Sequence, residues 1–90
     1  MAIIITYDIP SKHPEFKEKM FLLGYKESIP NNNCGTLYFP NTTLYHATKT
    51  ATSAKDDAQS IATQLGITLD RCISTQIGPD WNGVCGKPFN

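Results

Sequence analysis

The apolar pattern is clearest in the first ten positions, where a run rich in isoleucine predicts a β-strand from Ala2 to Ile9. Pro10 ends this strand because proline has no backbone N–H and keeps the preceding residue extended. Successive side chains of a strand point to opposite faces of its sheet. One face is therefore apolar (Ile3, Ile5, Tyr7, Ile9) and the other is mixed (Ile4, Thr6, Asp8). This difference is typical of a sheet with helices on one side and solvent or a second subunit on the other.

A first amphipathic helix is predicted from Pro14 to Leu23, since proline suits the first helical position. Ser11 or His13 would cap its start, and Gly24 would end it. Its buried stripe would consist of Phe16, Met20 and Leu23. Phe21 lies off this stripe, where it would either pack under a loop or mark a contact surface.

A second helix is predicted to begin at Ser53, which opens a Ser-x-x-Asp capping pattern, and to end at Gly66. Asp56 and Asp57 would lie in its first turn, where the helix dipole favours negative charge. Its apolar stripe is rich in alanine and would allow close approach to the sheet (Ala54, Ala58, Ile61, Ala62, Leu65).

The middle and the end of the chain carry strand patterns. Tyr25–Ile29 is ambiguous between strand and loop, whereas 30–33 has the composition of a loop. Segments 36–39 and 43–48 are predicted to pair as a hairpin around Pro40, Asn41 and Thr42. A last strand is predicted from Cys72 to Ile77, ended by Gly78 and Pro79.

In chain order these elements predict a ferredoxin-like α+β fold: strand, helix, two strands, helix and strand, with both helices on one face of an antiparallel sheet. Residues 1–79 would form this domain. Residues 80–90 would be a C-terminal tail packed on the domain or on a partner, with Trp81 and Phe89 as its partner-binding anchors.

The length and the net charge of the chain limit the kinds of function to be expected. Ninety residues suffice for one small domain with a modest core, which favours completion of that core by a homodimer. Eight basic and eight acidic side chains give zero net charge, and Arg71 is the only arginine. This balance is a poor match for duplex binding, which normally shows a basic excess on one face.

No run has the length of a membrane span, and the start lacks a basic leader, so we expect a cytoplasmic protein without membrane association.

The three cysteines, Cys34, Cys72 and Cys85, are widely spaced and odd in number. This pattern argues against a disulfide framework and against the usual structural zinc motifs. A zinc site that adds His46 is the alternative, but ordinary buried thiols are the expectation.

Asp8 is the first candidate for chemistry because it ends the first strand on the face away from the helices. In a dimer joined through that face, two copies of Asp8 would meet and hold Mg²⁺ or Mn²⁺ through oxygen ligands, with a phosphodiester as substrate. The alternative is structural: a short polar side chain at a strand end often caps the following turn.

Further candidates follow Asp8 along the chain. His13 is assigned a minor catalytic share in handling substrate or protons, and otherwise an exposed place at a helix start. Lys12, Lys17 and Lys19 form a small basic cluster for phosphate contacts, although Glu15 and Glu18 dilute it. The four tyrosines favour core and interface packing over a base-stacking surface.

The opening Ile-Ile-Ile-Thr-Tyr-Asp-Ile, followed by the predicted order of elements over residues 2–78, resembles the CRISPR-associated protein Two family. The resemblance implies a ferredoxin-like homodimer and a metal-dependent nuclease acting on nucleic acid, with Asp8 as its metal-binding catalytic residue. No arginine follows Asp8 closely, and 25–35 departs from the family pattern. The rival hypothesis is a non-catalytic dimeric interaction module that binds a protein through the open sheet face and the tail.

Overall fold

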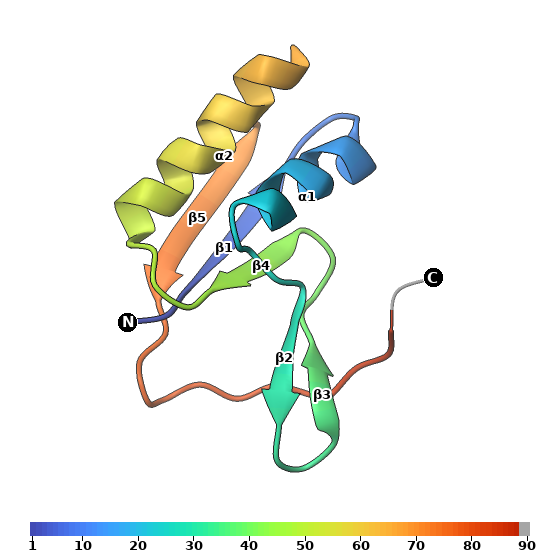
Figure 1. Ribbon diagram of the computed structural model, residues 1–90, viewed down its shortest axis with the longest axis vertical. Helices are drawn as coiled ribbons and strands as arrows, with labels where there is room; N and C mark the ends of the chain where they lie inside the picture. The colour runs from blue at the N-terminus through green and yellow to red at the C-terminus, as the bar shows by residue number, and fades with distance from the viewer. Residues whose placement is uncertain (89–90) are drawn as a thin grey trace.

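A computed structural model describes residues 1–88 and shows an α+β fold of two helices and two antiparallel sheets (Figure 1). The larger sheet has the order β4-β1-β5, and β2 pairs with β3 in a separate two-stranded sheet. Within residues 1–88, neither helix has the length and apolar character that crossing a bilayer requires.

Strand β1 (Ile3–Asp8) lies in the middle of the larger sheet, between β4 (Thr43–His46) and β5 (Arg71–Gln76). Its register places Ile5 opposite Leu44 on one side and opposite Ser74 on the other. The predicted alternation of β1 is confirmed, because Ile3, Ile5 and Tyr7 are buried while Thr6 and Asp8 are exposed.

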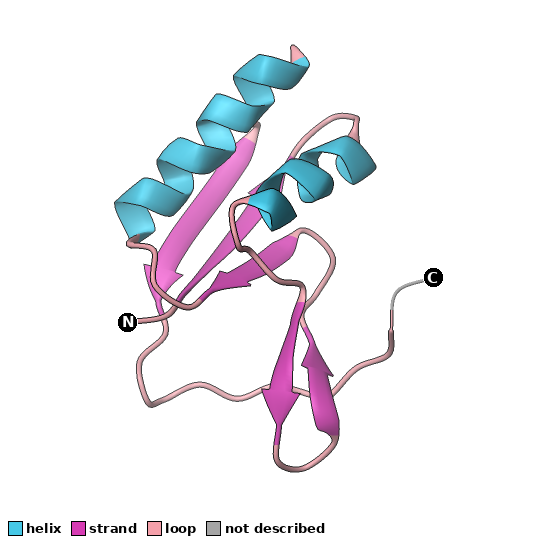
Figure 2. Ribbon diagram, in the orientation of Figure 1, coloured by secondary structure: helices cyan, strands magenta, loops and turns pink. Residues whose placement is uncertain are grey.

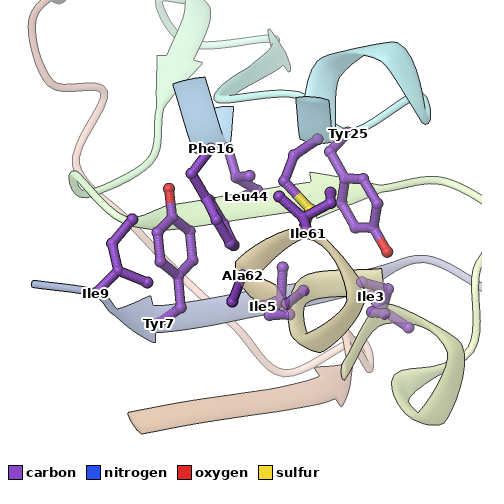
Figure 3. Packing of buried hydrophobic residues seen from close by; sticks show 12 residues of the cluster. Ile3, Ile5, Tyr7, Ile9, Phe16, Tyr25, Leu44, Ile61 and Ala62 are labelled. Atoms are coloured by element: carbon purple, nitrogen blue, oxygen red, sulfur yellow. The ribbon is translucent and has the colours of Figure 1, made fainter. Parts of the chain in front are cut away.

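The helices α1 (His13–Leu22) and α2 (Ala51–Leu65) cover the same face of this sheet (Figure 2). Between the helices and β1 lies the hydrophobic core shown in Figure 3. The core joins the apolar face of β1 to residues of both helices and β4 (Phe16, Met20, Leu44, Ala54, Ala58, Ile61, Ala62). No helix of residues 1–88 covers the opposite face of the sheet, which is called here the open face.

The predicted hairpin of 36–39 and 43–48 is wrong. Strand β3 (Gly35–Tyr38) pairs with β2 (Ser28–Asn31), and β4 pairs with β1. The other edge of β4 is occupied by an isolated bridge between Lys26 and Tyr45. Both edges of β4 thus form backbone pairs, one with β1 and one with Lys26. β3 pairs with β2 instead of β4.

Helix α1 begins one residue earlier than predicted and has a different cap. Its N-cap is Lys12, in a left-handed conformation with φ of 60° and without a capping hydrogen bond from its side chain, so the expectation for Ser11 or His13 is wrong. Phe16 and Met20 are buried as predicted. Leu23 is not, because the chain leaves the helix at this residue; it is exposed, as is Phe21.

Helix α2 ends at Gly66 as predicted, in a left-handed conformation with φ of 69°. Its start differs: Thr50 is the N-cap, and Thr50 and Ser53 form a reciprocal capping box. Because the helix begins earlier than expected, Asp56 and Asp57 lie beyond the first turn. The expected dipole interaction of these two residues is therefore wrong, and Asp57 is used in a tertiary contact instead.

Candidate binding site on the open face

Asp8 ends β1 directly opposite Arg71, the first residue of β5. Arg71 donates a hydrogen bond from Nε to Asp8 Oδ2 at 2.6 Å, which also makes the two residues an ion pair. Their side chains are 53 % and 79 % exposed for Asp8 and Arg71, respectively. The hydrogen bond and the charge of Asp8 raise the pKa of Arg71. Asp8 is thus paired with a cation on the neighbouring strand. Neither of the two roles expected from the sequence, metal ligand or turn cap, includes this partner.

The residues near Asp8 do not form a complete metal site within one chain. Across residues 1–88, no group of three or more histidine, cysteine, aspartate or glutamate side chains is arranged to hold a metal ion. A single carboxylate gives few of the oxygen ligands that Mg²⁺ or Mn²⁺ takes from a protein. A metal at Asp8 would therefore take its other ligands from water, from a substrate or from a second chain.

The predicted basic cluster is divided among separate contacts. Lys12 donates from Nζ to the Leu65 carbonyl at 2.9 Å, where it ties the start of α1 to the end of α2. Lys17 forms an ion pair with Glu27 at 3.2 Å and donates to Asn41 Oδ1 at 3.0 Å. Lys19 lies half-buried in the last turn of α1, and His13 is exposed at its first turn. Two of the three lysines therefore have structural roles, and the structure does not gather the three around Asp8.

His46 has a structural role as well. Its Nδ1 accepts hydrogen bonds from the backbone N–H groups of Thr48 and Lys49 at 3.1 and 3.2 Å. Nε2 lies 3.0 Å from the Leu23 carbonyl and therefore acts as the donor of a neutral ring. The ring also packs edge-on against Tyr25, with centroids 4.8 Å apart. These contacts connect β4 to the end of α1.

A hollow, called here the chamber, lies on the open face between β1, the β2–β3 hairpin and the tail. This chamber has a volume of about 670 Å³. Its floor includes Ile4, Thr6 and Thr43 from the open face, and one wall includes Leu37 and Phe39. The tail forms another wall with its apolar and small residues (Trp81, Gly83, Val84, Gly86), and Ile77, directly after β5, also lines the chamber. The chamber is mainly apolar, and the remaining lining is largely uncharged.

A disulfide between Cys34 and Cys85 holds the tail in this position. The expectation of three ordinary thiols is wrong for this pair, because folding brings together two cysteines that are 51 residues apart. The Tyr38 N–H also donates to the Cys85 carbonyl at 2.9 Å. Cys72 is the free cysteine of the three, and partial burial raises the pKa of its thiol. In this bonded state Cys34 and Cys85 cannot serve in the zinc site that was the alternative.

Figure 1 shows the path of the tail, which leaves β5 and crosses to the β2–β3 hairpin. Trp81, one of the two predicted anchors, lines the chamber and is partly exposed. Phe89, the other predicted anchor, lies outside the described residues.

Sequence reasoning missed Arg71, the cysteine pair and Lys87 as members of this surface. Arg71 carried one signal, since it directly precedes a predicted strand as Asp8 ends another. The cysteine pair carried none, because an odd count leaves the pairing undetermined. Lys87 is a single lysine in the tail, and only the path of the tail places it at the chamber.

Comparison of the chain with family profiles, with curated proteins and with solved structures found no match.

Proposed function

We propose that this protein is a non-catalytic interaction module that binds a protein partner, in the first instance a second copy of itself, through the open face and the tail. The observation that carries the proposal is the exposed apolar side chain of Ile73, which is 68 % exposed in the middle of β5. In a sheet face turned to water, such a residue is expected to be polar. Trp81 and Val84 in the tail are also exposed, so the apolar surface extends beyond one residue.

These residues belong to one continuous surface. Ile73 lies opposite Thr6 in the β1–β5 register, and Thr6 lines the chamber. Asp8 and Arg71 lie at the next exposed positions of the same strands and balance each other's charge. A face with exposed apolar residues, on which Asp8 and Arg71 neutralise each other, suits contact with another protein more than contact with nucleic acid.

We also propose that the fold is ferredoxin-like. The three strands of the larger sheet are antiparallel, and Lys26 extends the order on the side of β4 that faces away from β1. Together with two helices on one face, this order supports a ferredoxin-like arrangement in which the β2–β3 hairpin has separated from the main sheet. The open face is then the surface available for pairing two domains.

Substitution of Ile73 by Asp tests the proposal, with Leu22→Asp as a matched control. Leu22 is 81 % exposed on α1, so both changes place a charge at an exposed apolar position. Sedimentation velocity over a range of protein concentrations should show self-association of the native chain and of Leu22→Asp, and its loss in Ile73→Asp. Monomeric native protein, or equal association of all three proteins, would contradict the proposed dimer.

A metal-dependent nuclease is the second candidate function. It is favoured by the half-exposed carboxylate of Asp8 on the open face, because two copies paired through this face would each contribute one carboxylate. Mg²⁺ or Mn²⁺ would be the metal, with Lys12 or His13 as helpers. RNA and DNA cleavage should be measured with and without Mg²⁺ for the native chain, Asp8→Asn and the exposed control Asp80→Asn. Equal activity in the native chain and Asp8→Asn, or none in either, would reject this function.

The Cys34–Cys85 disulfide is unusual for the cytoplasmic location expected from the sequence. Disulfides persist in oxidising compartments and are uncommon in the cytosol, where they are usually transient. A cytoplasmic location therefore predicts that Cys34 and Cys85 exchange between bonded and reduced forms in the cell. Alkylation of rapidly quenched cells, followed by mass spectrometry of the peptides containing these residues, measures the two forms.

A further inference from the structure

The chamber under the tail has the properties of a small-molecule site. Its volume of about 670 Å³ lies within the range of about 300–1,000 Å³ that is usual for ligand pockets. Its walls come from three separate parts of the chain: the open face, the β2–β3 hairpin and the tail. We propose that this chamber binds a small molecule with an apolar body and a single carboxylate, a ligand class that lies beyond the interaction module proposed above.

The apolar body of the ligand is inferred from the walls. Leu37 and Phe39 are buried beside the chamber, and Ile4 and Ile77 contribute further aliphatic surface. Trp81 adds a large flat side chain that remains 45 % exposed. A ligand placed against these groups would remove apolar surface from water, which is the main favourable term in binding of this kind.

The carboxylate is inferred from the charge of the lining. Lys87 is the one residue with a formal positive charge in the lining of the chamber, and no aspartate or glutamate is found there among residues 1–88. An anionic group at Lys87 would therefore meet a complementary charge without a competing acid of the lining. Asn41, Asn82 and Thr43 add polar groups that can donate hydrogen bonds to carboxylate oxygens.

The tail is held by a covalent bond, and this favours a preformed chamber. Cys85 is bonded to Cys34 of the hairpin, and the residues on both sides of Cys85 line the chamber. A wall fixed in this way loses little conformational freedom when a ligand binds. The site is thus part of the folded domain rather than a surface that a partner must order.

The experiment uses the native chain, and its readout is the fluorescence of Trp81, the only tryptophan. Dodecanoate and dodecyltrimethylammonium are titrated below their critical micelle concentrations, and dodecanol below its solubility limit in water. They share the alkyl chain and differ in the charge of the head group. We expect a saturable change with dodecanoate, weaker binding of dodecanol and the weakest binding of the cation. Equal or non-saturable responses to the three probes would overturn the proposal, since they would report unspecific association with apolar surface.

Three variants locate the site. Lys87→Gln removes the charge and should weaken dodecanoate binding about fivefold, as expected for one exposed ion pair, with little effect on dodecanol. Thr6→Phe fills the floor of the chamber and should weaken binding of both probes at least about tenfold. Thr52→Phe is the matched control, because Thr52 is exposed on α2, which covers the other face of the sheet, and does not line the chamber.

Unchanged dodecanoate affinity in Lys87→Gln would reject the carboxylate, and unchanged affinity in Thr6→Phe would reject the chamber as the location. Circular dichroism of each variant verifies that it is folded. The same titration of Ile73→Asp separates this proposal from the interaction module, because that variant should lose self-association and retain ligand binding.

Discussion

Arg71 donates a hydrogen bond to Asp8 across the β1–β5 pair, although the two residues lie 63 positions apart in the sequence. The pair balances the charge of the carboxylate that the sequence presents as the main catalytic candidate. It also lies on the face that we propose for self-association, so its strength depends on whether water or a second molecule covers it.

We expect the Asp8–Arg71 pair to contribute little to the stability of the monomer, because both side chains are exposed to water. A double-mutant cycle with Asp8→Asn and Arg71→Gln, followed by urea unfolding at low protein concentration, measures the coupling between the two residues. The coupling should be small in dilute buffer and vanish in about 1 M salt, where charges are screened beyond about 3 Å. A coupling that persists in high salt would contradict an exposed pair.

Tyr7 and Tyr25 are both buried, but only Tyr25 has a hydrogen-bond partner for its hydroxyl among residues 1–88. Tyr25 donates to Asp57 Oδ2 at 2.8 Å, whereas Tyr7 Oη has no partner in that part of the chain. Tyr25→Phe should therefore destabilise the fold by about 1–2 kcal/mol. Tyr7→Phe should be neutral or stabilise it by up to about 1 kcal/mol, because it removes a buried polar atom without a partner. Urea unfolding of both variants measures this contrast, and equal losses would contradict it.

Burial also raises the pKa of Tyr7 to about 12, with a further contribution from the charge of Glu27. The unfolded chain releases this proton near pH 10, whereas the folded chain retains it. The stability contributed by Tyr7 is therefore complete below about pH 10 and is lost as the pH rises from about 10 to about 12. Unfolding curves measured from pH 8 to 12 should show that Tyr7→Phe loses less stability than the native chain. Parallel losses in the two proteins would contradict this assignment.

Gly24 has a positive φ of 94°, and a Cβ atom at this position would lie 2.9 Å from His46 Nε2. Gly24→Ala should therefore destabilise the fold by about 2–3 kcal/mol, since both the backbone and the imidazole are disturbed. Gly66→Ala is the matched control, because Gly66 also has a positive φ but no atom within 4 Å of the added Cβ. The control should cost about 1 kcal/mol, the backbone contribution alone. Equal losses in urea unfolding would show that the imidazole contact is unimportant.

The Cys34–Cys85 disulfide closes a long segment, with a sequence separation of 51 residues. Replacing both cysteines by serine should lower the free energy of unfolding by about 2–4 kcal/mol, because the unfolded chain gains freedom. The emission of Trp81 should shift to longer wavelength, since the tail is no longer held against the chamber. The free cysteine provides the control: Cys72→Ser should leave the emission of Trp81 unchanged. A tail that stays in place in the double variant would show that noncovalent contacts suffice.

Local patterns in the sequence were sufficient to predict several elements correctly. The alternation of β1 identified its buried face, and the alanine-rich stripe and Gly66 identified the core of α2 and its end. These features depend on periodicity and on the backbone preference of one residue, both of which are local. The strand pairing was different, because β3 and β4 each have a strand pattern that does not specify a partner.

The sequence by itself determined the presence of both helices, the apolar face of β1 and the place of Asp8 at the end of a strand. Only the tertiary structure decided that Asp8 meets Arg71, that Cys34 joins Cys85, and that the tail forms a chamber with the open face. Each of these contacts joins residues far apart in the chain, and its formation depends on the packing of the whole fold. The physical reason for this difference is the distance along the chain over which each effect acts. Hydrophobic periodicity depends on residues a few positions apart, whereas the proposed binding surface forms only when distant segments come together.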